Sequence, residues 1–192
     1  MLLNPSSVKA RSHLKTEVSD IDRTTRNKRI IKWAVLVFFT IIVFTLQATP
    51  SFLEIFEIKP ILLLPLAITI PMFEGEWSGG FAALGCGLLW DMSSESPFGS
   101  YGFLCLVAGV ATGLLLKFLL RNEWFNCLFL VFVASFVVFS LEFLFTYAIY
   151  SYENYAPVFF TKHLPMILYT TAVSPIIYYI VKLIEKIKPE EF

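Results

Sequence analysis

The sequence has little charge, and the charge that it has is unevenly placed. Charged residues make up 16% of the 192-residue chain and hydrophobic residues 57%, whereas soluble domains usually carry roughly 25% charged residues. Of the 30 charged residues, 11 lie in the first 32 positions, so the other 160 residues hold only 19. This scarcity excludes a disordered chain and an ordinary soluble globule, and it indicates a polytopic membrane protein.

Reactive and metal-ligating residues are also few. The three cysteines, Cys86, Cys105 and Cys127, lie in apolar stretches without the spacing of a zinc site, so we interpret them as small hydrophobic residues. The two histidines fit no metal-binding pattern, and no nucleophile motif or phosphate-binding loop occurs. We therefore expect no catalytic residue, no cofactor and no metal. The net charge of zero predicts no attraction to nucleic acid.

Long apolar runs are what the sequence does have. They cover residues 30–48, 60–73, 77–90, 101–120, 125–150 and 164–184. The second and third runs have 14 residues each and reach about 21 Å as helices, less than the hydrocarbon core of roughly 30 Å. Pro65 should kink the second. We predict an all-α, polytopic transmembrane helical bundle of about six spans, in which these two are short or broken and lie inside the bundle.

Three regions follow from this pattern. Residues 1–29 form a polar, basic head, interpreted either as a short amphipathic helix or as a disordered segment. Residues 30–185 form the transmembrane domain, and residues 186–192 form a short tail. With six spans and an inside N-terminus, 13 of the 15 basic residues lie inside and only Lys59 and Lys162 lie outside. Because basic residues favour the cytoplasmic side, both termini are predicted to be cytoplasmic.

A stripe of small residues marks the third run. It repeats every four residues as Gly75, Gly79, Ala83 and Gly87. A second Gly-x-x-x-Gly pair, Gly109 and Gly113, lies in the fourth run. Small residues let helix backbones approach closely in lipid, so the stripe indicates either packing within the chain or a docking face for another membrane protein.

Two acidic residues stand out against the apolar background. Asp91 ends the stripe at the predicted outer boundary, before a loop that contains Gly99. It either caps a turn through the amides of Ser93 or Ser94 or has a role with a partner or a proton. Glu142 lies between apolar neighbours in the fifth run and is predicted to be the most buried charge of the chain, so its carboxyl must be protonated or paired. Its candidate partners are Lys59, Lys162, Thr170, Thr171 and Ser174.

The sequence resembles the rod shape-determining protein MreD family over about residues 30–185. The likeness rests on a glycine-rich helix that ends in Gly-Leu-Leu-x-Asp, a loop of about eight residues with a glycine, and a second glycine-bearing helix. These features occupy residues 79–81, 87–91, Gly99, 101–102 and 109–113, and residues 60–65 fit as well. The residue after Pro60 is Ile61, where the family often has an acidic residue.

The resemblance implies a non-catalytic scaffold of the bacterial cell-elongation machinery, in the bacterial cytoplasmic membrane. The implied partners are an MreC-type membrane protein, an MreB-type actin-like filament and a RodA-type polymerase with its transpeptidase. It also implies a fold similar to the substrate-binding subunits of energy-coupling-factor transporters. That fold supplies an alternative function, the capture of a vitamin-type molecule for import. The first apolar run lacks the alanine-rich docking motif of those subunits, which favours the scaffold.

Overall fold

The structure is a computed structural model that describes residues 5–49, 59–94, 99–150 and 163–186. In these residues it contains six helices, which confirms the predicted helical fold. They are α1 (Pro5–Ala48), α2 (Leu63–Glu74), α3 (Glu76–Ser93), α4 (Ser100–Phe118), α5 (Trp124–Tyr150) and α7 (Leu164–Glu185).

Four segments are long and apolar enough to cross a membrane. Within the described residues they are Arg26–Ala48 of α1, Ser100–Phe118, Trp124–Leu144 of α5 and Leu164–Glu185. Helix α2 is a shorter apolar helix of 12 residues, about 18 Å long at 1.5 Å per residue. Helix α3 has 18 residues and is longer than the predicted third run. The chain is therefore an integral membrane protein.

Helix α2 lies at the centre of the bundle and contacts all five other described helices. Every residue from Leu63 to Met72 is buried, because the segment is apolar on all sides and has no face suited to water. The kink predicted at Pro65 was wrong. Pro65 falls in the first turn of α2, where the backbone amides have no acceptor within the helix, so the amide hydrogen that proline lacks is not missed. The proline inside the helix is Pro71.

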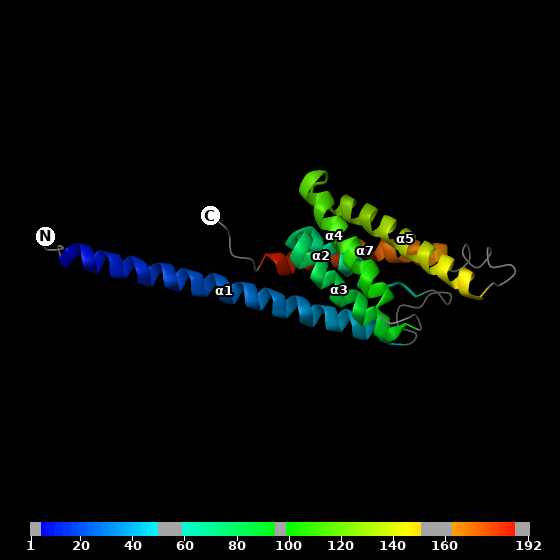
Figure 1. Cartoon of the computed structure of the whole chain (residues 1–192), viewed down its shortest axis with the longest axis horizontal. Coiled ribbons are helices and arrows are strands. Elements are labelled where there is room, and N and C mark those ends of the chain that lie inside the picture. Colours follow the sequence, from blue (N-terminus) through cyan, green and yellow to red (C-terminus); the bar gives the residue numbers. More distant parts are fainter. Residues whose placement is uncertain (1–4, 50–58, 95–98, 151–162, 187–192) are drawn as a thin grey trace.

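Helix α1 is much longer than the bundle that it touches. Figure 1 shows it along one side of the bundle, with its N-terminal part extending beyond, toward the side on which α7 ends. The helix begins at Pro5, so the polar head that we expected to be a short helix or a disordered segment continues directly into the first apolar run. Of the short tail, the structure describes only Lys186.

Candidate functional site

Asp91 joins the end of α3 to the start of α4. Its Oδ1 accepts a hydrogen bond from the amide of Tyr101 (3.0 Å), and its Oδ2 accepts bonds from Gly99 (3.1 Å) and Gly102 (3.0 Å). The first amides of a helix have no partner within the helix, and a negative charge is favoured at this end. The side chain is only 4% exposed, so the carboxylate is used inside the chain.

This cap differs from the predicted one. One of the two alternatives for Asp91 was a cap on the amides of Ser93 or Ser94, but the hydroxyls of these serines donate instead to the carbonyls of Trp90 and Asp91. Gly99 adopts a positive φ of 97°, a conformation that costs glycine little. The chain can therefore turn and bring the first amides of α4 onto the Asp91 carboxylate.

Aromatic stacking reinforces the same junction. Trp90 and Tyr101 lie on either side of it, and their rings stack at 4.0 Å with an angle of 9° between the planes. Both side chains are buried. The Trp90 ring also meets the edge of Phe139 on α5 at 6.5 Å. The junction between α3 and α4 is thus fixed by packing as well as by hydrogen bonds.

The small-residue stripe is packed against neighbouring helices of the same chain. A β-carbon added at Gly87 would lie 2.5 Å from the carbonyl oxygen of Tyr101, and one added at Gly79 would lie 2.3 Å from Cα of Pro71. Both distances are below any real contact between such atoms. Gly85, two residues before Gly87 and therefore on the opposite side of the helix, has nothing within 4 Å. Gly75 differs from the other members of the stripe because it forms the turn between α2 and α3, where it adopts a positive φ of 83°.

The two glycines of α4 complete this contact. A β-carbon at Gly109 would lie 2.6 Å from Cβ of Ala83, and one at Gly113 would lie 2.5 Å from Cα of Glu76. Lys117, one turn after Gly113, forms an ion pair with the Glu76 side chain. Helices α2, α3 and α4 therefore form one closely packed group, which we call the α2–α3–α4 unit.

Glu142 on α5 is only half-buried, so it is not the most buried charge as the sequence suggested. It lies near His163, where burial lowers the pKa of the imidazole and the Glu142 charge acts in the opposite direction. The predicted hydroxyl partners are engaged elsewhere. Thr170 accepts from the Ile61 amide, while Thr171 and Ser174 donate to backbone carbonyls. Lys59 donates to the Thr49 carbonyl, and Lys162 lies outside the described residues.

A buried ion cluster was not predicted from the sequence. Lys32 of α1 is 2% exposed. Its Nζ contacts the carboxylate of Glu74 at the end of α2 and lies 3.5 Å from Glu185 at the end of α7. A lysine within the first apolar run was a signal, since a charge at that depth needs a partner. The three segments are far apart in the sequence, so only the fold could identify the carboxylates.

A second polar contact ties α1 to α2 at the opposite end of α2. The side-chain oxygen of Gln47 accepts a 3.0 Å hydrogen bond from the amide of Leu63, one of the amides that the start of α2 leaves unpaired. Gln47 is 8% exposed. Helix α1 therefore contacts both ends of α2, through Lys32 at its C-terminal end and through Gln47 at its N-terminal end.

These observations define a class of protein: an integral membrane helical bundle with a closely packed unit at its centre. The chain belongs to the rod shape-determining protein MreD family, whose pattern matches residues 27–187. This match confirms the family resemblance and places the chain among membrane proteins of rod-shape determination. No curated protein and no solved structure gives a match to the chain.

Proposed function

We propose that this protein is a non-catalytic scaffold of the bacterial cell-elongation machinery, which it serves by holding membrane-anchored partners of peptidoglycan synthesis. The observation that carries this proposal, beside the family, is the close packing of the α2–α3–α4 unit. At Gly79, Gly87 and Gly113 an added β-carbon would meet backbone atoms of the neighbouring segment, so the helices lie backbone against backbone. A closely packed bundle of this kind is suited to presenting fixed faces.

The faces available to partners are apolar. On α1, Val37, Phe38 and Ile41 are exposed. On the α2–α3–α4 unit, Phe81 and Phe103 are exposed. Within a bilayer such faces meet lipid tails or the membrane helix of another protein, and close packing then decides between the two. The membrane anchors of an MreC-type protein and of a RodA-type polymerase with its transpeptidase are the partners that we propose for these faces.

The proposed location is the bacterial cytoplasmic membrane, with both termini in the cytoplasm and six crossings. The strongest support is the distribution of basic residues, 13 inside against Lys59 and Lys162 outside. Figure 1 shows the start of α1 and the end of α7 on the same side of the bundle, as an even number of crossings requires. The polar part of α1 would then extend into the cytoplasm, where an MreB-type filament could contact it.

We propose that Asp91 acts in this scaffold as a positioning residue. Because three backbone amides occupy its carboxylate, its effect on partners would pass through the α3–α4 junction. Glu142 is proposed to have a structural role beside His163. The fold is also proposed to be similar to the substrate-binding subunits of energy-coupling-factor transporters, and import of a vitamin-type molecule is the alternative function.

Complementation of cell shape tests the proposal. In a strain that lacks its native copy, the wild-type chain should restore rods, and Gly87→Leu should give rounded cells because its side chain forces α3 from α4. Gly85→Leu is the matched control, since Gly85 faces open space. Rods with Gly87→Leu at normal abundance would contradict the proposal. Saturable uptake of a small molecule by the purified chain with an energising module would favour the transporter instead.

A further inference from the structure

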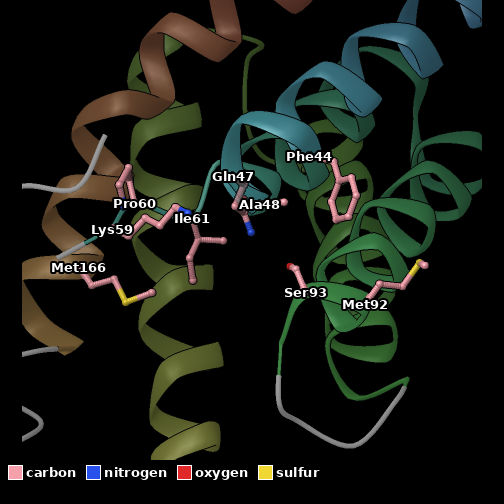
Figure 2. A pocket seen from close by; sticks show the side chains of 9 residues that line it. All are labelled: Phe44, Gln47, Ala48, Lys59, Pro60, Ile61, Met92, Ser93 and Met166. Carbon is pink, nitrogen blue, oxygen red and sulfur yellow. The ribbon is translucent and has the colours of Figure 1, made fainter. Parts of the chain in front are cut away.

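A cavity of about 460 Å³ lies where the end of α1, the segment before α2, the end of α3 and the start of α7 come together. Its volume is within the roughly 300–1,000 Å³ of small-molecule sites. Figure 2 shows the side chains around it. The residues that line it are Phe44, Gln47, Ala48, Lys59, Pro60, Ile61, Met92, Ser93 and Met166.

The nitrogen-bearing side chains at this cavity are hydrogen-bond donors. The Leu63 amide occupies the oxygen of Gln47, and this bond fixes the orientation of the side-chain amide. Figure 2 shows the nitrogen of Gln47 directed into the space between Ile61 and Ser93. The Lys59 ammonium uses one of its three hydrogens on the Thr49 carbonyl, and among the residues that the structure describes the other two are available to a ligand.

The chemistry of the lining selects the ligand. Lys59 is the charged residue among the nine, and the other nitrogen-bearing side chain, Gln47, is nine-tenths buried. The Ser93 hydroxyl donates to the Trp90 carbonyl. A ligand that fits must therefore accept hydrogen bonds and carry negative charge. The remaining wall is largely apolar, with six of the nine residues being Phe44, Ala48, Pro60, Ile61, Met92 and Met166. A ligand that fills the cavity therefore also has an apolar part.

We propose that this cavity binds a membrane phospholipid with an anionic headgroup. The phosphate accepts hydrogen bonds from Lys59 and Gln47, and the start of an acyl chain lies against Phe44 and Met92. Phospholipid is favoured over free phosphate because the cavity is at an end of the bundle's membrane helices and most of its wall is apolar. Met92 and Ser93 place this site beside the α3–α4 junction, but the proposed lipid contacts use none of the Asp91 hydrogen bonds and do not depend on any protein partner.

Cysteine protection tests the proposal directly. The native cysteines are buried, so Ser93→Cys provides one reactive thiol at the cavity. The protein is placed in vesicles of phosphatidylcholine alone or with one-third phosphatidylglycerol, and an uncharged, membrane-permeant maleimide is added. Phosphatidylglycerol should slow modification about tenfold if it fills nine-tenths of the cavities, because only the empty fraction reacts. Ser100→Cys, exposed at the start of α4 and outside the lining, should react equally in both vesicles.

Substitutions of Gln47 and Lys59 test whether these two side chains donate the hydrogen bonds to the lipid. Gln47→Glu keeps an acceptor for the Leu63 amide but replaces the donor with a negative charge, so protection of the Ser93→Cys thiol should disappear. Lys59→Gln should give the same loss. Equal rates for the Ser93→Cys thiol in both vesicle types would overturn the proposal, as would full protection in Gln47→Glu. Protection by free glycerol phosphate at millimolar concentration in phosphatidylcholine vesicles would overturn the assignment to a lipid.

Discussion

Replacement of Asp91 tests the junction between α3 and α4 most sharply. Asp91→Ala removes the acceptor of three backbone amides at 3.0–3.1 Å in a site that is 4% exposed. A buried donor left without a partner costs about 1–3 kcal/mol, and a helix cap about 0.5–2 kcal/mol. Because the three bonds share one carboxylate, their contributions are not additive, and we expect a loss of about 3 kcal/mol.

Asp91→Asn should fall between Asp91→Ala and the wild type. Its single oxygen can serve either the Tyr101 amide or the pair of Gly99 and Gly102, while its NH₂ group then faces a donor. We expect a loss of about 1–2 kcal/mol, since at least one hydrogen bond is lost and the remaining ones no longer go to a charged acceptor. Stability should therefore decrease from the wild type to Asp91→Asn and then to Asp91→Ala. If only the volume of the side chain mattered, Asp91→Asn would be as stable as the wild type.

The assay is unfolding in mild detergent, followed by heat and by hydrogen exchange. For a chain of this size, about 3 kcal/mol should lower Tm by roughly 6–12 °C. Exchange should accelerate at the amides of residues 99–102 before the rest of α4. Glu123→Gln is the control, because the Glu123 side chain is exposed and lies 3.9 Å from Arg121, and such pairs contribute about 0–1 kcal/mol. Wild-type Tm and exchange in Asp91→Ala would show that the Asp91 hydrogen bonds do not stabilise the α3–α4 junction.

Two further predictions concern packing and the buried cluster. Gly87→Ala should lower the free energy of unfolding by about 1–3 kcal/mol, because its β-carbon meets the Tyr101 backbone; Gly85→Ala should change it by less than about 0.5 kcal/mol, and equal Tm values would count against the packing. Lys32→Met should cost about 3–5 kcal/mol by leaving buried carboxylates unpaired. Adding Glu74→Gln should recover part of that loss, and a double variant with strictly additive costs would argue against a coupled cluster.

The sequence was sufficient to predict the features that repeat along a single helix. Apolar length predicted the helical membrane fold, and the four-residue spacing of small residues predicted close packing around Gly79 and Gly87. Asp91 was singled out because a carboxylate at the end of an apolar run is unusual. The hydrogen-bond donors predicted for Asp91 were wrong. A carboxylate at the end of a helix can cap its own turn or the next helix, and the path of the loop between α3 and α4 decides which.

The features that join distant segments could not be predicted in this way. Lys32 was visible as a charge in an apolar run, but Glu74 and Glu185 lie more than 40 positions away and no periodicity connects them. Gln47 had the appearance of an ordinary polar residue at a helix end. The burial of Glu142 was overestimated because apolar neighbours in the sequence do not show which side of a helix faces the bundle. The cavity likewise exists only through the meeting of four segments.

Co-purification in mild detergent, with mass spectrometry of the bound proteins, shows whether this chain holds the partners that we propose. The wild-type chain should retain an MreC-type protein and a RodA-type polymerase, and Gly87→Leu should lose them while Gly85→Leu keeps them. A folded wild-type chain that restores rod shape but retains neither protein would contradict the scaffold proposal.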